Sequence, residues 1–380
     1  MKKKVILGLS GGVDSSVAAI KLMEQGYDVE GLFMRNWDAS VNNDVLGNPT
    51  KNDDICPEEK DYADALAVSN KLGIKLHRID FIEEYWDNVF SYFLDEYKKD
   101  RTPNPDVMCN KEIKFKAFLK EALRLNADYI AMGHYAQVDR SDGITRLLRA
   151  VDKNKDQTYF LCLLSQEQLS KALFPIGDII KPEVRRIAEE YGLVTAHKKD
   201  STGICFIGER RFHEFLKNYL PSIPGNMETI DGIKVGEHDG LMYYTIGQRK
   251  GLNIGGNNKF ENKPWFVIGK NLEKNALIVS QDEHDILLKS NRIIVKDYSF
   301  VYDLPIEGRE YGAKFRYRQP DKGVYVKIID DKTLEVTYDE YYAVTPGQVC
   351  ALYDGEVCLG GGIIDQVFYN DEPRAFFNNK

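Results

Sequence analysis

Residues 4–26 read KVILGLSGGVDSSVAAIKLMEQG, and this stretch decides the fold of the first part of the chain. The apolar run at residues 5–9 predicts a buried parallel strand. Helical spacing over residues 13–25 predicts a helix that ends at Gly26. Between them, two glycines let backbone N–H groups turn tightly toward an anion. We therefore predict a phosphate-binding loop at a helix N-terminus.

The same alternation of strand and helix patterns continues along the first half. Further strands are predicted at residues 27–34, 74–81 and 129–132, and further helices at 58–72, 82–98, 112–125 and 182–191. This order predicts an α/β domain with a parallel sheet. Past Pro221, short strands and Gly-rich turns predict a small middle domain and then a C-terminal β-barrel. We expect domains at 1–208, 209–280 and 281–380.

Composition restricts the class of protein. The 380 residues are 43% hydrophobic and carry a net charge of −8, which argues mildly against nucleic-acid binding except through a local basic patch. No apolar stretch is long enough to span a membrane, and the lysine-rich start lacks the apolar segment of a signal peptide. A cytoplasmic location is expected, with no membrane partner.

The six cysteines are too sparse for a disulfide framework, and no Cys/His cluster suggests a bound metal. Cys109 follows a proline-stiffened segment, and Asn110 is a suitable N-cap for the helix predicted after it. A helix N-terminus and nearby lysines would then lower the pKa of the Cys109 thiol. Cys205 lies in a polar, Gly-containing segment that predicts a mobile loop. We expect Cys162, Cys350 and Cys358 to be packing residues and Cys56 to be an exposed bystander.

The loop Ser10-Gly11-Gly12-Val13-Asp14-Ser15 lacks the lysine of a GxxxxGK[ST] P-loop. It resembles the SGGxDS signature of the ATP pyrophosphatases, or PP-loop enzymes, which cleave ATP between its α and β phosphates. Asp14 would either cap the helix or hold Mg²⁺. Met34 and Gly133 end predicted strands, where α/β sheets bind ligands.

Over nearly its full length, the sequence resembles the bacterial tRNA-specific 2-thiouridylases. The motifs that carry this resemblance are GLSGGVDS (8–15), TPNPDVMCNKEIKF (102–115), AMGHYA (131–136), KDQTYFL (155–161), FPIGDIIKPEVRRIA (174–188), KKDSTGICFIGER (198–210), YTIGQRKGLNIGG (244–256), FRYRQP (315–320), TPGQ (345–348) and GEVCLGGGII (355–364). The cysteine motifs and the C-terminal motifs are the specific ones.

The resemblance implies that ATP adenylates the C2 oxygen of the wobble uridine in a tRNA anticodon. A persulfide on Cys205, loaded by a cysteine desulfurase or a sulfur-relay protein, would supply sulfur. Cys109 would act as the nucleophile that releases it, with Asp106 as a proton acceptor. The residues implied for ATP are Gly8, Leu9, Ser10, Gly11, Gly12, Val13, Asp14, Ser15, Met34 and Gly133. Those implied for tRNA are Asn104, Pro105, Asp106, His134, Lys155, Asp156, Gln157, Arg316, Tyr317 and Gln348.

Two other classes fit parts of the pattern. One is another ATP pyrophosphatase, such as a tRNA lysidine synthetase or an amidotransferase synthetase, which needs no cysteine pair. The other is a non-catalytic tRNA-binding protein, for which an intact SGGVDS loop and both cysteine segments are unexpected. A tRNA methyltransferase is a further alternative, but no separate methyl-donor motif is evident.

Overall fold

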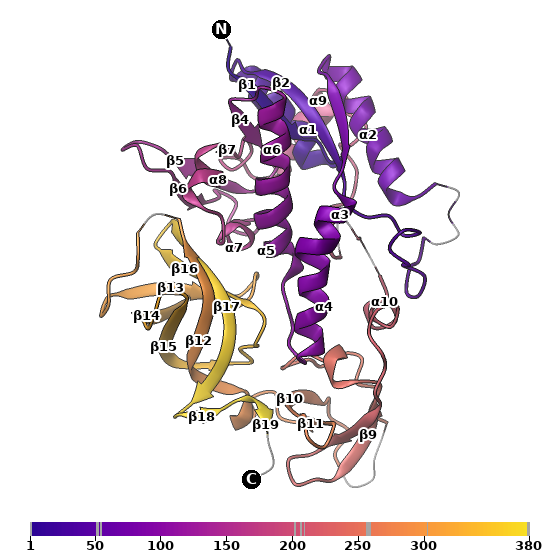
Figure 1. Ribbon diagram of the computed structural model, residues 1–380, viewed down its shortest axis with the longest axis vertical. Helices are drawn as coiled ribbons and strands as arrows, with labels where there is room; N and C mark the ends of the chain where they lie inside the picture. The colour runs from indigo at the N-terminus through magenta and orange to yellow at the C-terminus, as the bar shows by residue number, and fades with distance from the viewer. Residues whose placement is uncertain are drawn as a thin grey trace.

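The computed structural model describes residues 2–50, 53, 55–200, 203–205, 207–208, 210–255, 260–301 and 303–377. An α/β part lies at one end of the molecule, and a barrel and a small middle part lie next to each other at the other end (Figure 1). The fold class predicted from the sequence is therefore confirmed.

The α/β part is built on a parallel sheet whose strand order is β3-β2-β1-β4-β7. Val5 and Leu7 pack into one hydrophobic cluster with helix α1, whereas Ile6 belongs to a second cluster on the other face. The strands are β1 (Lys4–Gly8), β2 (Asp28–Arg35), β3 (Leu76–Asp80), β4 (Tyr129–Ala131) and β7 (Ala172–Leu173). The covering helices include α1 (Val13–Glu24), α2 (Pro57–Leu72), α7 (Thr158–Leu161), α8 (Gln166–Ser170) and α9 (Lys181–Glu190).

Two long helical stretches run from this sheet toward the middle part, and each contains a π-helical segment (Figure 1). The first comprises α3 (Ile82–Tyr85), η1 (Trp86–Phe90) and α4 (Ser91–Lys98). The second comprises α5 (Pro105–Cys109), η2 (Asn110–Ala117) and α6 (Phe118–Arg124). π-Helical turns are rare and occur frequently at functional sites.

The second stretch corrects the sequence prediction, which placed Cys109 in a loop and Asn110 at the helix start. The helix begins at Pro105, and the Asn104 side chain caps it by accepting a hydrogen bond of 3.3 Å from the Val107 N–H. Proline fits the first helical position because its missing N–H has no partner there. Cys109 therefore lies inside the helix, one turn after its start.

The middle part contains a five-stranded sheet of order β19-β10-β11-β8-β9. The strand β19 comes from the end of the chain and pairs in parallel with β10, so the C-terminal segment returns from the barrel to the middle part. The elements are α10 (Phe212–Leu216), β8 (Gly225–Glu228), β9 (Lys234–His238), η3 (Leu241–Tyr243), β10 (Phe266–Asn271), β11 (Ala276–Ser280) and β19 (Ala375–Phe377).

Six antiparallel strands close into the C-terminal barrel in the order β12-β15-β14-β13-β16-β17, and β17 pairs back with β12. Closure removes the exposed sheet edges. The elements are η4 (Ile286–Leu288), β12 (Lys289–Phe300), β13 (Glu310–Lys314), β14 (Lys322–Ile328), β15 (Thr333–Tyr342), β16 (Val349–Asp354), β17 (Val357–Tyr369) and β18 (Glu372–Pro373).

A hairpin of the α/β part, β5 (Ala136–Asp139) and β6 (Arg146–Arg149), extends the barrel sheet by pairing with β17. Leu147 pairs with Cys358, and the Arg149 N–H donates to the Glu356 carbonyl at 2.9 Å. The Arg149 guanidinium also lies 3.7 Å from the centroid of the Tyr353 ring. Backbone pairing and a cation–π contact thus join the two parts.

An aromatic cluster joins the α/β part to the middle part. The ring of Trp37 is fully buried and lies 4.8 Å from Phe90, which in turn lies 4.8 Å from Tyr219 and 5.9 Å from Phe215. Such rings contribute a large apolar area together with edge-to-face attraction. One continuous hydrophobic cluster therefore spans the long helices and α10.

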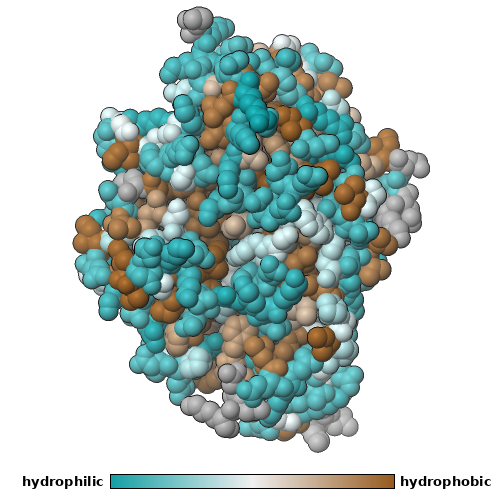
Figure 2. Space-filling view, in the orientation of Figure 1, coloured by the Kyte–Doolittle hydropathy of each residue, from teal (hydrophilic) through white to brown (hydrophobic). Residues whose placement is uncertain are grey.

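Polar residues cover most of the face seen in Figure 2, with apolar residues scattered among them. Among the described residues, no helix has the length and apolarity required to cross a bilayer.

The turn before α9 provides a test of packing. A Cβ at Gly177 would lie 1.7 Å from the Ala136 carbonyl oxygen at the start of β5. Overpacking against backbone costs about 1–3 kcal/mol, so we expect Gly177→Ala to lower the melting temperature by several degrees. Gly255→Ala, whose Cβ would meet no atom within 4 Å, is the matched control. Equal melting temperatures for both variants in thermal unfolding would contradict this packing.

Candidate active site

The phosphate loop connects β1 to α1, as the sequence predicted. Gly12 is the N-cap and contributes no side chain, so the N–H groups of the first helical turn face the loop. The Ser10 N–H donates to Ser15 Oγ at 3.2 Å, and the two hydroxyl oxygens lie 3.1 Å apart. These bonds hold the loop in shape around a position where a helix N-terminus favours an anion.

Asp14 lies in the first turn of α1 and forms an ion pair. Both of its carboxylate oxygens accept from Lys181 Nζ, at 2.7 and 2.8 Å, and Oδ1 also accepts from the Tyr135 hydroxyl at 2.9 Å. Of the two roles that the sequence left open for Asp14, helix capping is excluded because Gly12 holds that position.

Lys181 also contacts Asp200, at 2.8 Å, and thereby links the phosphate loop to the chain that leads to Cys205. Lys155 and Arg185 contact the same Asp200 carboxylate at 2.7 and 3.1 Å. Burial alone would raise the pKa of Asp200, but Lys155 and Lys181 outweigh it and lower the pKa to about 2. On the other side of the loop, Lys198 donates to the Gly11 carbonyl at 2.9 Å.

The residues expected to bind the nucleotide lie close together at the ends of the strands. A Cβ at Gly8 would lie 2.6 Å from Met132 Sδ and 3.5 Å from Met34 Cε. A Cβ at Gly133 would lie 2.8 Å from the Ser15 backbone nitrogen. Met34 and Gly133 therefore adjoin the β1 end and the phosphate loop, where they were predicted to lie.

Cys109 and Cys205 lie in direct contact although 96 positions separate them in the sequence. The Cys109 thiol donates to the Cys205 sulfur, and the two sulfur atoms are 3.6 Å apart. Asp106 Oδ1 accepts from the Cys205 N–H at 3.1 Å, and the Tyr85 hydroxyl donates to the Cys205 carbonyl at 2.8 Å. The backbone of Cys205 is thus held from both sides. Both thiols are free.

The two thiols have opposite electrostatic environments. Burial raises the pKa of Cys109 well above its usual value, which corrects the expectation of a lowered pKa. The hydrogen bond from Cys109 lowers the pKa of Cys205 against the effect of burial, and the nearby Lys114 lowers it further. The anion therefore forms first on Cys205.

The residues after Gly133 connect the phosphate loop to the cysteine pair. His134 is buried, with its ring centroid 6.0 Å from Phe115 on η2 and 6.2 Å from Phe174. Burial, and next the charge of Lys114, lower the pKa of His134 well below its usual value, so the imidazole is neutral. Gly133 lies against the phosphate loop and His134 lies near Phe115 on the helical stretch of Cys109, so two neighbouring residues just after β4 connect the two centres.

Three of the other residues expected to contact tRNA lie just before α7 or pack against it. Asp156 is buried and accepts from the Thr158 hydroxyl, whereas Gln157 accepts from the Tyr135 N–H. Tyr317 packs against Phe160 with 4.3 Å between ring centroids.

Two barrel residues contact other parts of the molecule, and one of them, Gln348, holds the segment that leads into α5. Gln348 donates to the carbonyls of Thr102 and Pro103 at 2.8 and 3.2 Å. Arg316 donates to the Ile246 and Ala343 carbonyls at 2.9 and 3.1 Å, and so joins the barrel to the middle part. The sequence reasoning placed Lys114 near Cys109 but did not foresee its effect on Cys205. It missed Tyr85, Tyr135, Lys181 and Asp200, for which no local pattern offered a signal.

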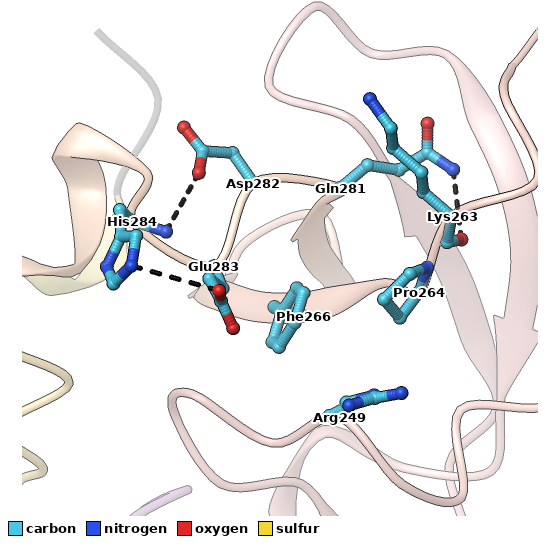
Figure 3. Close-up of a pocket in the computed structure, with 8 residues that line it drawn as sticks. All are labelled: Arg249, Lys263, Pro264, Phe266, Gln281, Asp282, Glu283 and His284. Carbon is cyan, nitrogen blue, oxygen red and sulfur yellow. Dashed lines mark hydrogen bonds and ion pairs between the residues drawn. The ribbon is translucent and has the colours of Figure 1, made fainter.

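A separate hollow of about 410 Å³ lies on the middle part. Figure 3 shows its lining side chains, which carry both charge signs: Arg249, Lys263, Pro264, Phe266, Gln281, Asp282, Glu283 and His284. None of the predicted site residues lines it, so it is not the site described above. Among the described residues, no cluster of His, Cys, Asp or Glu is arranged to hold a metal ion.

The fold and the site define an α/β nucleotide-binding enzyme that carries a pair of thiols in addition to its phosphate loop. Comparison with family descriptions matches residues 3–209 to a tRNA methyl transferase HUP domain, 213–281 to a tRNA methyl transferase PRC-barrel domain and 290–364 to an aminomethyltransferase β-barrel domain. Together with the relatives below, these matches show that the chain belongs to the tRNA-specific 2-thiouridylase family.

The relatives match along nearly the whole chain. The tRNA-specific 2-thiouridylase MnmA of Acholeplasma laidlawii (strain PG-8A) is 58% identical over 377 residues, which cover 99% of this chain and 100% of that protein. The protein of the same name from Staphylococcus aureus (strain bovine RF122 / ET3-1) is 59% identical over 374 residues, which cover 97% and 96%. A 4-thiouridine synthetase–RNA complex with bound ATP aligns at 16% identity and a TM-score of 0.34, over 55% of this chain and 45% of that one, and this likeness carries no argument.

Gly133 tests the fit of the nucleotide site. We expect Gly133→Ala to weaken ATP binding at least about fivefold, because the added Cβ would push on the backbone of Ser15 and overpacking there costs at least about 1 kcal/mol. Isothermal titration with ATP measures this, and Gly255→Ala is the control. Unchanged ATP affinity in a folded Gly133→Ala protein would refute the placement of the nucleotide.

The opposite pKa shifts of Cys109 and Cys205 lead to a second prediction. Cys205 should be alkylated by iodoacetamide at lower pH than Cys109, because only the thiolate reacts. Cys109→Ala removes the hydrogen bond that lowers the pKa of Cys205 and should move its alkylation profile to higher pH. Peptide mass spectrometry over a pH series follows each thiol. Identical profiles for Cys205 with and without Cys109 would contradict the assignment.

Proposed function

We propose that this protein is a tRNA-uridine 2-sulfurtransferase that uses ATP and a protein persulfide to replace the C2 oxygen of the wobble uridine by sulfur. One observation carries the proposal: two thiols from distant segments lie 3.6 Å apart, and the neighbouring residues Gly133 and His134 lie next to Ser15 and to Phe115 on the helical stretch of Cys109. An enzyme that adenylates an oxygen and then supplies sulfur needs both centres in one site.

In the first step, the C2 oxygen of uridine attacks the α-phosphorus of ATP, the α–β bond breaks, and pyrophosphate leaves. The loop at Ser10–Ser15 would hold the phosphates through backbone N–H groups, with Lys181 as a nearby counter-charge. The Asp14 carboxylate fits as one ligand of a Mg²⁺ ion held mainly by the phosphates, since Mg²⁺ usually takes one or two carboxylates with substrate phosphates. Such an ion would neutralise charge on the pyrophosphate.

In the second step, the terminal sulfur of a Cys205 persulfide bonds to C2 of the adenylated base. The Cys109 sulfur then attacks the Cys205 sulfur, so the persulfide S–S bond breaks and a Cys109–Cys205 disulfide forms. The sulfur left on C2 forms the C=S bond as AMP departs. An external thiol reductant must reopen the disulfide before the next turnover.

Asp106 lies beside the reacting sulfur atoms, and burial raises its pKa, with partial compensation from the Cys205 N–H and Lys114. A carboxyl group of raised pKa suits the acceptance of a proton during sulfur transfer. The residues 104–106, 134, 155–157, 316–317 and 348 are proposed to meet tRNA, and a desulfurase or relay protein is proposed to load Cys205. Because both thiols act in their reduced form, we also propose a cytoplasmic location.

We expect Cys109→Ser and Cys205→Ser each to abolish tRNA thiolation while tRNA affinity stays within about twofold, because each removes one sulfur from the exchange and leaves the side chains proposed to meet tRNA in place. Mass spectrometry of nucleosides from tRNA incubated with protein, ATP and a desulfurase measures 2-thiouridine. Cys56→Ser, an exposed cysteine, is the matched control.

Two results would contradict the proposal. Thiolation by either variant at the wild-type rate would exclude the two-cysteine scheme. Release of ADP rather than AMP and pyrophosphate would exclude adenylation. Consumption of an amine in place of persulfide would instead support the alternative ATP pyrophosphatase classes.

A further inference from the structure

Lys114 is brought to the cysteine pair by the π-helical segment that follows Cys109. In an α-helix, a residue five positions further along lies about 140° around the axis, since each residue turns about 100°. The segment η2 begins at Asn110, directly after Cys109, and its i→i+5 bonding is seen where the Phe118 N–H donates to the Ile113 carbonyl. The wider turn carries position 114 back toward the face of Cys109.

The ammonium of Lys114 belongs to the cluster of groups around the reacting atoms. It interacts electrostatically with the sulfur atoms of Cys205 and Cys109 and with the Asp106 carboxyl group, which lies on the same helical stretch and accepts from the Cys205 N–H. Burial would lower the pKa of Lys114, but these three groups outweigh it and raise the pKa, so Lys114 stays cationic. A buried ammonium is retained only where anionic partners repay its desolvation.

The remaining groups around the pair do not supply this charge. His134 is neutral because burial and Lys114 lower its pKa. Tyr85 stays protonated because burial raises its pKa, and its hydroxyl donates a hydrogen bond to the Cys205 carbonyl. Of the titratable groups that face the two sulfur atoms in the described part of the chain, Lys114 is the cation and Asp106 the carboxyl group.

We propose that Lys114 is a catalytic residue of the sulfur transfer, in which its ammonium holds the sulfur of Cys205, and then the persulfide on it, as an anion while Cys109 stays protonated. This inference rests on the proposed function, and it assigns the two thiols different roles. Cys205 is kept ready to accept and carry sulfur, whereas Cys109 is held back until the sulfur has bonded to the base. No bond forms or breaks at Lys114.

The test compares Lys114→Met and Lys114→Arg with Lys116→Met in the full-length protein. Lys116 is an exposed lysine two positions further along the same helix, paired with Glu112. We expect Lys114→Met to move the alkylation profile of Cys205 to higher pH by at least about one unit, since an adjacent opposite charge shifts a pKa by about 1–3 units. Thiolation should slow at least about tenfold, with the KM for ATP unchanged. Lys114→Arg and Lys116→Met should keep the wild-type profile.

An unchanged Cys205 profile in a folded Lys114→Met protein would overturn the proposal. If Lys114→Met does not fold, the Lys114→Arg variant tests the proposal instead. Alkylation of its Cys205 only at the pH typical of a free thiol would show that a positive charge at this position does not control the pKa of Cys205. The alkylation measurement needs neither tRNA nor ATP. A wild-type protein that fails to thiolate tRNA but shows the expected profiles would therefore overturn the proposed function and leave the role of Lys114 toward Cys205 standing.

Discussion

The contact between two buried thiols is the constraint on which the rest of the site depends. Thiols in apolar surroundings resist ionisation. A reactive pair therefore requires a nearby charge and contacts that fix the two backbone segments carrying the thiols. The helix from Pro105 supplies Cys109, Asp106 and Lys114 together, and Asp106 and Tyr85 hold the Cys205 backbone. The ion pairs of Lys181 with Asp14 and Asp200 then tie this arrangement to the phosphate loop.

The segment just before that helix is held by the other two parts of the molecule, the middle part and the barrel. Lys270 of the middle part is buried and donates to the Asp100 carbonyl at 2.6 Å, and Arg101 pairs with Asp365 of the barrel at 2.8 Å. Thr102 accepts from Gln348 through its carbonyl and donates through its N–H to the Pro346 carbonyl at 3.0 Å. The position of the helix that carries Cys109 is therefore set by contacts with segments that are distant in the sequence.

The sequence was sufficient for elements that depend on local patterns. The glycine turn at residues 10–12, the α1 and α2 ends at glycines and the change to β-structure all follow from spacing and turn chemistry. The sequence-based prediction was wrong where a contact between distant segments determines the local structure or the pKa of a side chain. Asn110 looked like an N-cap, yet Asn104 and Pro105 start the helix earlier, and the raised pKa of Cys109 comes from burial by segments remote in the chain. No local pattern indicates a π-helical turn, so the approach of Lys114 to Cys205 was not foreseen.

The hydrogen bonds between β6 and β17 make the barrel a continuation of the catalytic domain's own framework. The barrel and the α/β part cannot rotate freely relative to each other, because such a rotation would break the backbone hydrogen bonds between β6 and β17. The span from the barrel surface to the sulfur atoms is consequently almost constant. Under the proposed function, a tRNA that contacts both the barrel and the sulfur atoms would have to adapt its own shape to this distance. Selection among tRNAs would then depend partly on how readily each one bends and extrudes a base.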